Sequence, residues 1–314
     1  MKLHWVKPQG LCRRSVALGT FDGVHLGHRQ LIDVAIAKRP SFGCSTVFTF
    51  DTPPEQVFTG RVRLLTDFTV RQDLLFEQGI DEVVWVAFDK SLAAEPPEQF
   101  VRDILIRALR VDHVVCGFNF RFGHQARGTP DLLREFGQRY GFSVDVVEPF
   151  LVDGKTVSST RIRQCLLAGR VKEAAHLLGR FQSYVGVVTS GAGRGRKLGF
   201  PTANVAVAKE LVLPEDAVYA TWSILGSGQG YPSVTAVSRN PTFEGKQRTV
   251  ESYLLDFSGD LYGQVMEIQF LSKLRGIVRY DDVKTLKKQI ELDVAEARAH
   301  ISRMRLQQGR VVLE

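Results

Sequence analysis

Short apolar runs alternate with amphipathic stretches through the first half of the chain. The runs are rich in Val and Phe and predict strands at residues 16–18, 46–50, 83–88, 114–118 and 144–147. Strands that alternate with helices indicate a parallel sheet covered on both faces. Ligands bind such a sheet beyond the carboxyl ends of its strands, where residues 19–28 and 119–123 would fall.

The stretches between these strands carry helical signals. We expect helices at residues 26–38, 97–109, 130–140 and, in two short pieces, 158–179. Thr129 and Pro130 are typical of a helix cap and a first helical residue, and Gly141 is typical of a helix end.

The pattern changes in the second half, where strand-like runs follow one another without a long helix between them. These runs are residues 184–189, 218–224, 233–238, 250–257 and 265–271. Residues 258–260, Ser-Gly-Asp, are typical of a hairpin turn. A small antiparallel β-barrel is the fold that this pattern predicts.

A final helix is expected at residues 281–307, because Leu286, Ile290, Val294 and Ala297 repeat at spacings of three and four. Its apolar face would pack on the barrel. The predicted fold class is therefore α/β followed by β. We expect two domains, residues 1–182 with the parallel sheet and residues 183–314 with the barrel and the helix.

Residues 19–28, Gly-Thr-Phe-Asp-Gly-Val-His-Leu-Gly-His, are the most informative segment of the chain. They join a predicted strand to a predicted helix, so His25 and His28 share one face of its first turn. Backbone N–H groups and the helix dipole favour phosphate at such a terminus. Two imidazoles there would stabilise negative charge on a reacting phosphate. A pair of surface histidines beside a turn is the alternative.

Residues 158–163, Ser-Ser-Thr-Arg-Ile-Arg, open another predicted helix. The hydroxyls of Ser159 and Thr160, together with Arg163, suit the alignment of reacting phosphates. An ordinary helix cap is the alternative explanation for the hydroxyl residues.

The second half contains a loop rich in glycine and basic residues, Gly-Ala-Gly-Arg-Gly-Arg-Lys-Leu-Gly, at positions 191–199. Its backbone is able to approach phosphate closely, although a flexible surface loop fits the composition equally well. Thr202 and Asn204 follow at strand spacing and offer two oxygen ligands on one face, which suits Mg²⁺. Glu251, in a weakly charged strand, is a candidate general base for a hydroxyl nucleophile. An outward-facing strand glutamate is the alternative.

The composition is that of an ordinary globular protein, with 44% hydrophobic and 24% charged residues and a formal net charge of +7. The basic residues are scattered, which favours phosphate-handling sites over nucleic acid or an anionic membrane as the partner. No signal-peptide or membrane-span pattern occurs. The four cysteines are far apart, and we expect them to be buried and reduced in a cytoplasmic protein.

Several motifs occur together in a fixed order. They are residues 19–28, the Gly-Phe-Asn-Phe-Arg-Phe-Gly segment at 117–123, residues 158–163, Gly-Phe-Pro-Thr-Ala-Asn at 199–204, Asn-Pro-Thr-Phe at 240–243, Glu251, and Asp-Leu-Tyr-Gly at 260–263. In this order they resemble the bifunctional riboflavin kinase/FMN adenylyltransferases of bacteria, also called prokaryotic FAD synthetases. The resemblance extends over residues 15–300.

The resemblance implies a Rossmann-like nucleotidyltransferase domain and a riboflavin kinase barrel. The first would adenylylate FMN with ATP to FAD and pyrophosphate. The second would phosphorylate riboflavin to FMN with Mg²⁺ and ATP. The ATP-binding residues of the first domain would be Gly19, Phe21, Gly23, His25, His28, Ser159, Thr160 and Arg163, with Asn119 and Phe120 at its flavin substrate. In the kinase, Gly193 and Gly199 would bind ATP, and Thr202 and Asn204 would bind Mg²⁺-ATP. Glu251 would be the base, and Arg298 would be near the flavin.

Three departures from the family pattern have consequences for function. Pro53 stands where the family has the histidine of a Pro-His-Pro element, Ser238 stands where glycine is common, and the Leu274-Arg275 pair is followed by Gly276-Ile277 without the usual glutamate. A kinase-dominant enzyme with a weak or lost adenylyltransferase is therefore one alternative. A basic nucleic-acid-binding protein on a nucleotidyltransferase scaffold is another.

Overall fold

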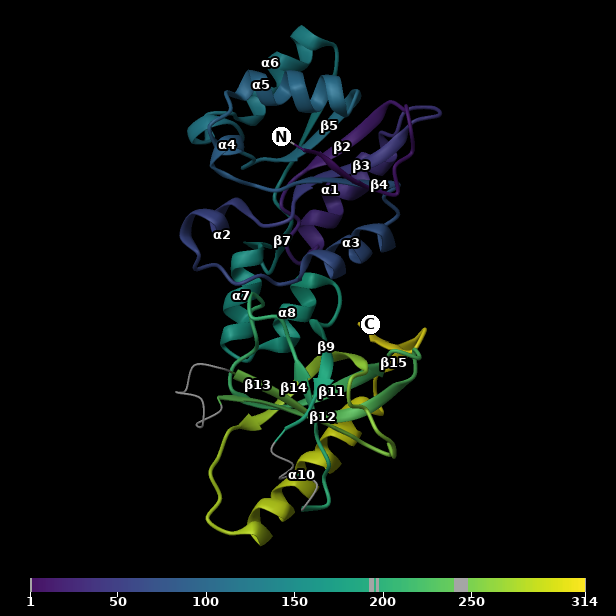
Figure 1. Ribbon diagram of the computed structural model, residues 1–314, viewed down its shortest axis with the longest axis vertical. Coiled ribbons are helices and arrows are strands. Elements are labelled where there is room, and N and C mark those ends of the chain that lie inside the picture. The colour runs from purple at the N-terminus through teal and green to yellow at the C-terminus, as the bar shows by residue number, and fades with distance from the viewer. Residues whose placement is uncertain (1, 192–194, 196–197, 240–247, 314) are drawn as a thin grey trace. The chain divides into compact units, whose positions relative to one another are not determined.

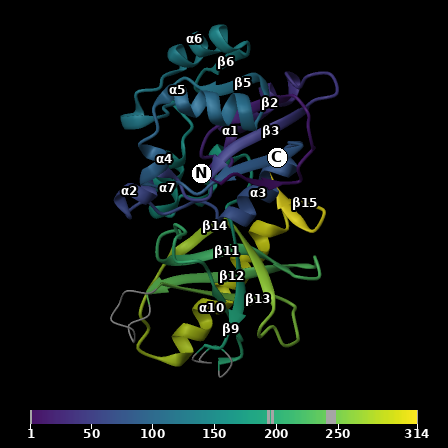
Figure 2. The same ribbon diagram turned by 45° about the horizontal axis from the view of Figure 1, so that its top comes forward.

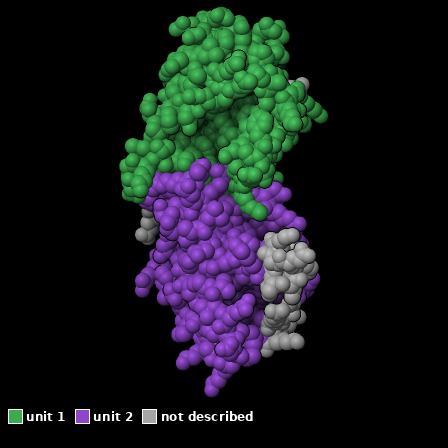
Figure 3. Space-filling model, turned by 90° about the vertical axis from the view of Figure 1, so that its left-hand side faces the viewer, with its two compact units in different colours: residues 1–159 green, residues 160–314 purple. Residues whose placement is uncertain are grey.

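The chain forms two compact units, residues 1–159 and 160–314 (Figure 3). The structure is a computed structural model, and it describes residues 2–191, 195, 198–239 and 248–313 (Figure 1).

The first unit is built on a mixed sheet that confirms the predicted strand alternation. Within the described residues its strands are β1 (His4–Val6), β2 (Arg14–Leu18), β3 (Cys44–Phe50), β4 (Glu82–Val86), β5 (Val111–Gly117) and β6 (Ser143–Val147). Their spatial order is β1-β4-β3-β2-β5-β6. Strands β2 to β6 are parallel, and β1, which the sequence did not reveal, is an antiparallel edge strand.

Helices cover both faces of this sheet, as a parallel sheet requires. They are α1 (Leu26–Ala37), α2 (Pro54–Thr59), α3 (Phe68–Glu77), α4 (Lys90–Ala93), α5 (Pro97–Phe100), the π-helix η1 (Val101–Ala108), the short 3₁₀ helix η2 (His124–Ala126) and α6 (Pro130–Tyr140). Alternate strand residues serve the two faces: Val16 and Leu18 pack with the α5–η1–α6 side, whereas Ala17 packs with α1 and α3. The small hairpin β7 (Leu151–Val152) and β8 (Lys155–Thr156) completes the unit.

Local signals located α6 well. The Thr129 side chain accepts a hydrogen bond from the backbone N–H of Leu132, Pro130 is the first helical residue, and Gly141 ends the helix with φ +80°. The predicted helix 97–109 is instead divided into α5 and the π-helix η1.

The prediction of four reduced cysteines was wrong for one pair. Cys12 and Cys44 form a disulfide across a sequence separation of 32 residues. Cys12 lies just before β2 and Cys44 begins the neighbouring strand β3, so parallel pairing brings two distant cysteines together. Cys116 and Cys165 are free and buried, as expected.

The second unit contains a closed antiparallel barrel, which confirms the predicted fold. In the described part of the chain its strands are β9 (Ser183–Thr189), β10 (Ala203–Ala206), β11 (Ala217–Leu225), β12 (Gly230–Arg239), β13 (Arg248–Leu254) and β14 (Val265–Gly276). They close in the order β10-β13-β12-β11-β14-β9. The expected hairpin at 258–260 was wrong, because β13 pairs with β10 and β12 while β14 pairs with β9 and β11.

Helices α7 (Ser159–Leu167) and α8 (Val171–Leu178) precede the barrel, and α10 (Val283–Ile301) packs against β11, β12 and β14 (Figure 2). The helix expected at 281–307 is shorter than predicted. Residues beyond it form a hairpin of β15 (Arg305–Gln307) and β16 (Arg310–Val312). Gln308 and Gly309 both have positive φ in its two-residue turn, a geometry that favours a hairpin over a continued helix.

The barrel interior holds a closed ring of hydroxyl groups. Its bonds are Thr221–Ser233 at 2.8 Å, Ser233–Ser223 at 2.8 Å, Ser223–Ser252 at 3.1 Å, Ser252–Thr235 at 2.9 Å and Thr235–Thr221 at 2.7 Å. All five residues are fully buried. Because Ser252 points inward, its strand neighbours Glu251 and Tyr253 point to the outer face of the barrel.

Candidate active sites

The first candidate site is the loop between β2 and α1. Phe21, Gly23 and Val24 all have positive φ, a conformation that is costly for the two non-glycine residues. A Cβ added to Gly23 would lie 2.6 Å from the Leu65 side chain, so only glycine fits there. Strain of this kind persists only where the surroundings hold it, and it is concentrated at functional sites.

Asp22 is the anchor of this loop. Its buried carboxylate accepts hydrogen bonds from the backbone N–H groups of Leu65 (2.9 Å) and Thr66 (3.2 Å), and the Thr66 hydroxyl accepts one from the Gly23 N–H. Ser159 donates its hydroxyl proton to the Asp22 carbonyl at 2.9 Å. Ser159 therefore contacts the loop directly, whereas Thr160 and Arg163 belong to the part of α7 in the second unit.

The two histidines of this loop stack on one another. His25 is the N-cap of α1, and its Nδ1 accepts a hydrogen bond from the backbone N–H of His28 at 3.2 Å. The ring centroids are 3.6 Å apart with an interplanar angle of 14°. A Cβ on Gly27 would lie 3.3 Å from the His25 ring, so this glycine leaves room for the stack. The pair occupies the helix terminus that favours anions.

An apolar cavity of about 360 Å³ adjoins this loop, with Gly19 in its lining. The lining is mostly apolar and is rich in phenylalanine, with Phe48, Phe50, Phe58, Phe88, Phe100, Phe120 and Phe122. Phe120, expected at the substrate, is in this lining, while Asn119 is exposed and is not among the lining residues. The other phenylalanines were not predicted as site residues, because their sequence positions are typical of an ordinary core.

Pro53 is buried and is the N-cap residue of α2, without a side-chain cap hydrogen bond. Its neighbour Pro54 lines the aromatic cavity. The position of the family histidine is therefore close in the chain to the cavity wall.

The second candidate site is on the barrel, where Asn204 and Glu251 are cross-strand partners in the β10–β13 pair. Thr202 precedes β10 by one residue and lines a cavity of about 240 Å³ together with Glu251. The structure thus brings together all three residues that were expected to hold Mg²⁺-ATP and to act as the base.

Two cavities meet at Thr202. One, of about 350 Å³, is lined by polar groups that include Ser258, Asp260 and Tyr262. The other, which holds Glu251, is mostly apolar, and its lining includes Val218, Val234, Tyr253, Ile277, Val278, Leu286 and Ile290. A partly polar cavity and a mostly apolar cavity therefore share Thr202, and Glu251 lines the apolar one.

Glycines shape the approach to Asn204. A Cβ added to Gly191 would lie 2.1 Å from Asn204 Nδ2, so a side chain there would displace the amide. Gly199 has φ +88° and open space around it. Gly193 and residues 240–243, which the sequence analysis singled out, lie outside the described residues.

Arg298 is in neither cavity lining. It forms a bidentate ion pair with Asp256 at 2.8 and 2.7 Å, and this hydrogen bonding lowers the pKa of Asp256. Arg275 pairs with the buried Asp293 of α10, so the Leu-Arg segment holds the helix that covers the apolar cavity.

Ser238, the second departure from the family pattern, lies 3.3 Å from the Thr249 hydroxyl.

Across the residues that the structure describes, no helix is both long enough and apolar enough to cross a bilayer.

An α/β unit with two histidines at a strand–loop–helix junction, followed by a barrel with a carboxylate in a surface cavity, fits the class of two-site transferases. The family model for FAD synthetase matches residues 7–161, and that for riboflavin kinase matches residues 178–301. The chain belongs to the family of bifunctional riboflavin kinase/FMN adenylyltransferases.

Relatives of this family cover the chain almost from end to end. A bifunctional riboflavin kinase/FMN adenylyltransferase of Pseudomonas fluorescens is 36% identical over 95% of this chain and 96% of the relative. The protein of the same description from Haemophilus influenzae is 32% identical over 91% of this chain and 93% of the relative. Among solved structures, a protein from Streptococcus pneumoniae titled a macrolide-efflux protein superposes with a TM-score of 0.83 at 30% identity, covering 93% of this chain and 97% of that one.

Proposed function

We propose that the barrel phosphorylates riboflavin to FMN and that the α/β unit transfers the adenylyl group of ATP to FMN, giving FAD. The observation that carries this assignment is a shared design. In each unit, residues that suit phosphate binding lie at or next to an apolar cavity, and this supports a flavin ring as the occupant of both cavities.

In the kinase step, Glu251 accepts the proton of the riboflavin 5′-hydroxyl as that oxygen attacks the γ-phosphate of ATP, and ADP leaves. The cross-strand pairing of Glu251 with Asn204 supports this role, because it places the base next to the nucleotide-binding residues. The apolar cavity beneath α10 would take the flavin ring, and the polar cavity beyond Thr202 would take ATP.

Mg²⁺ fits the donor atoms at the barrel site. The hydroxyl of Thr202 and the amide oxygen of Asn204 are the hard oxygen ligands that this ion prefers. The space that a Cβ on Gly191 would fill keeps the Asn204 amide accessible. The ion would neutralise phosphate charge, and Thr202 and Asn204 would hold the nucleotide to which the ion is bound.

In the adenylylation step, a phosphate oxygen of FMN attacks the α-phosphate of ATP and pyrophosphate leaves. Phosphate is already largely ionised at neutral pH, so the protein has to align the reactants and stabilise charge. His25, His28 and the N-terminus of α1 would stabilise the reacting phosphate. Gly19, Phe21, Gly23 and Ser159 would shape the ATP loop. The family resemblance makes Thr160 and Arg163 further candidates for ATP binding, and Phe120 and Asn119 would meet the flavin.

Adenylylation is the weaker of the two activities in this proposal, because Pro53 replaces a histidine thought to assist it. Proline also fixes φ and removes an N–H donor. The stacked histidine pair keeps the reaction going without that third imidazole.

The partners in this proposal are riboflavin, FMN and ATP. Many arginines are paired with carboxylates, such as Arg39 with Asp81 and Arg139 with Glu98, which argues against a basic surface for nucleic acid. We place the enzyme in the cytoplasm, where ATP is supplied.

One assay tests both assignments. The protein is incubated with riboflavin, ATP and Mg²⁺, and FMN is separated from FAD by chromatography. FMN should accumulate ahead of FAD, and FMN supplied directly should give FAD and pyrophosphate. Absence of both products would reject the function, and FMN without FAD would support the kinase-dominant alternative.

A further inference from the structure

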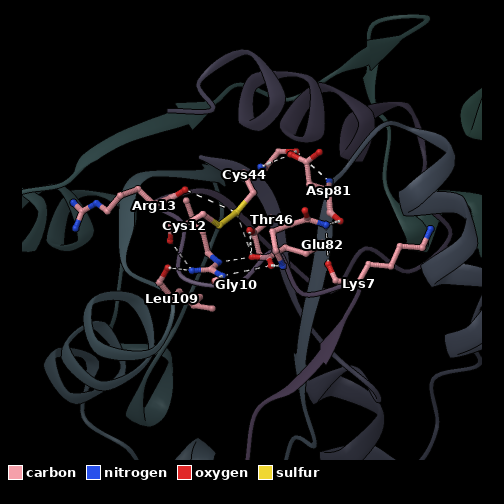
Figure 4. A network of polar contacts seen from close by, with 12 residues as sticks. Lys7, Gly10, Cys12, Arg13, Cys44, Thr46, Asp81, Glu82 and Leu109 are labelled. Carbon is pink, nitrogen blue, oxygen red and sulfur yellow. Dashed lines mark hydrogen bonds and ion pairs between the residues drawn. A yellow bond between two sulfur atoms is a disulfide. The ribbon is translucent and has the colours of Figure 1, made fainter. Parts of the chain in front are cut away.

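The disulfide of the first unit closes a loop that contains one of the candidate sites. Cys12 precedes β2 and Cys44 begins β3, so the crosslinked segment includes β2, the whole of residues 19–28, and α1 (Figure 4). All of it lies in the first unit. The covalent link therefore constrains the adenylyltransferase half of the chain and leaves the barrel outside the loop.

A buried ion pair lies beside the disulfide. Arg14 and Glu82 are 3% and 0% exposed, and the Arg14 guanidinium also donates to the carbonyls of Gly10, Cys12 and Leu109 (Figure 4). The non-covalent cluster thus holds the chain before β2 against the neighbouring strands. This cluster should keep the fold intact when the sulfur–sulfur bond opens.

Glu82 is fully engaged in the same cluster. Its carboxylate accepts hydrogen bonds from Arg14, from the Thr46 hydroxyl at 2.7 Å and from the backbone N–H of Gln9 at 3.0 Å. The sulfur atoms of Cys12 and Cys44 and a Glu82 oxygen lie within 4.8 Å of one another, a spacing that a metal ion would also accept. A metal would have to take Glu82 from Arg14 and sit beside that positive charge. The cluster therefore favours a dithiol/disulfide couple over a metal site.

The other two thiols do not compete for this chemistry. Burial raises the pKa of the Cys116 thiol to about 12 and also raises that of Cys165. Thiolates are the reactive form, so both stay inert. Cys12 is half-buried while Cys44 is buried, which makes Cys12 Sγ the sulfur that an external thiolate would reach.

We propose that Cys12–Cys44 is a reversible redox-modification site that takes a dithiol reductant and sets the stability of the adenylyltransferase unit. A reductant thiolate attacks Cys12 Sγ, the Cys12–Cys44 bond breaks, and the Cys44 sulfur leaves and takes up a proton. The second reductant thiol then attacks the mixed disulfide, which frees Cys12 as a thiol and leaves the reductant as its own disulfide. Two electrons and two protons pass to the protein, and an oxidised dithiol reverses the exchange.

The physical effect of the link is on the unfolded chain. Closing a loop of this length removes conformational freedom from the unfolded state, so reduction lowers the thermal midpoint of the unit by about 10 °C. The barrel is outside the loop and should not respond. In a reducing compartment, disulfides that do form are mostly labile and redox-sensing, which agrees with a reversible site.

The test uses the full chain, oxidised with oxidised dithiothreitol or reduced with dithiothreitol. Each sample is heated for a fixed time over a temperature series, freed of reagent and assayed separately for FMN formation from riboflavin and for FAD formation from supplied FMN. Reduction should shift the midpoint for loss of FAD formation down by about 10 °C, with FMN formation unshifted. Thiol titration in denaturant should give two thiols in the oxidised protein, Cys116 and Cys165, and four in the reduced protein.

Three variants complete the test. Cys12→Ser and Cys44→Ala should both behave like the reduced protein and lose any response to the reagents, while Cys165→Ser should keep the full response. Equal midpoints for oxidised and reduced protein, a shift in both activities, or four thiols after oxidation would each overturn the proposal. Stoichiometric Zn²⁺ binding by the reduced protein, absent from Cys12→Ser, would replace it with the metal site.

Discussion

Glu251 is the residue on which the kinase assignment depends most. Glu251→Gln should lower FMN formation by about 10²–10⁴-fold, because Gln keeps the shape but cannot accept the hydroxyl proton. FAD formation from supplied FMN should be unchanged. Glu291→Gln, on the exposed part of α10, is the matched control and should keep both activities. Wild-type FMN formation by Glu251→Gln would show that this carboxylate is not the base.

Gly191 tests the geometry of the same site from the nucleotide side. Gly191→Ala should reduce kinase efficiency roughly 10–100-fold by pushing the Asn204 amide away from its place. The effect should appear chiefly in the KM for Mg²⁺-ATP. Gly226→Ala, where an added Cβ meets only an ordinary contact at 3.6 Å, should be neutral. Equal steady-state kinetics for the two variants would contradict the proposed role of Asn204.

His28 is the corresponding residue of the adenylyltransferase. His28→Ala should lower FAD formation by about 10²–10³-fold, the usual cost of losing one group that stabilises transition-state charge. FMN formation should be unaffected. His124→Ala changes an exposed histidine of the same unit and should leave both rates unaltered. Normal FAD production by His28→Ala would remove the site assignment.

Strands β5 and β6 are joined by a titrating contact. His113 Nε2 lies 3.0 Å from Asp145 Oδ2, Ser143 contacts the other ring nitrogen, and Lys38 is close to the same carboxylate. Burial lowers the pKa of His113, although Asp145 acts in the opposite direction. In the unfolded chain His113 takes up a proton near pH 6.5, whereas in the folded chain it stays neutral to a lower pH. The free energy of unfolding is therefore highest above pH 6.5 and decreases as the pH falls below it.

The thermal midpoint of the first unit should consequently drop between pH 7.5 and pH 5.5. The drop should be smaller in His113→Gln, which cannot take up the proton, and unchanged in His124→Gln. Midpoints are measured by loss of FAD formation after heating at each pH. A larger drop in His113→Gln would mean that the Asp145 contact outweighs burial.

Elements whose signals are local were predictable, and those that depend on distant partners were not. Thr129, Pro130 and Gly141 located α6 because a cap, a first turn and a left-handed end are local features. The expected helix end near residue 307 was wrong because the apolar spacing continues to Met304, while Gln308 and Gly309 turn the chain into a hairpin. The edge strand β1 is only three residues long, too short for a periodicity to show.

The motif residues of both candidate sites were predictable from the sequence, but the residues that surround them in the fold were not. Thr202, Asn204 and Glu251 meet because of a strand register that no spacing reveals. The phenylalanines of the cavity beside Gly19 come from five separate segments, each of which resembles core when taken alone. The disulfide escaped notice for the same reason, since its cysteines become neighbours only when β2 and β3 pair.

The two units should respond together to metal removal and separately to mutation. Excess EDTA should abolish both FMN and FAD formation, because each step must neutralise phosphate charge through a divalent cation, and added Mg²⁺ should restore both. Thr202→Ala should raise the Mg²⁺ requirement of FMN formation alone. An equal rise for FAD formation in that variant would contradict two independent sites.

The hydroxyl ring inside the barrel should allow barrel opening to be followed by NMR. The five hydroxyls make five hydrogen bonds, so each hydroxyl donates its one proton to a neighbour in the ring. Because Thr235 donates to Ser252, the donor and acceptor of every other bond in the ring follow. Hydroxyl protons normally exchange with water too fast to be seen by NMR, but these are sealed from it. They should give sharp, slowly exchanging resonances that vanish together when the barrel opens. These resonances would measure barrel closure without a label near either candidate site.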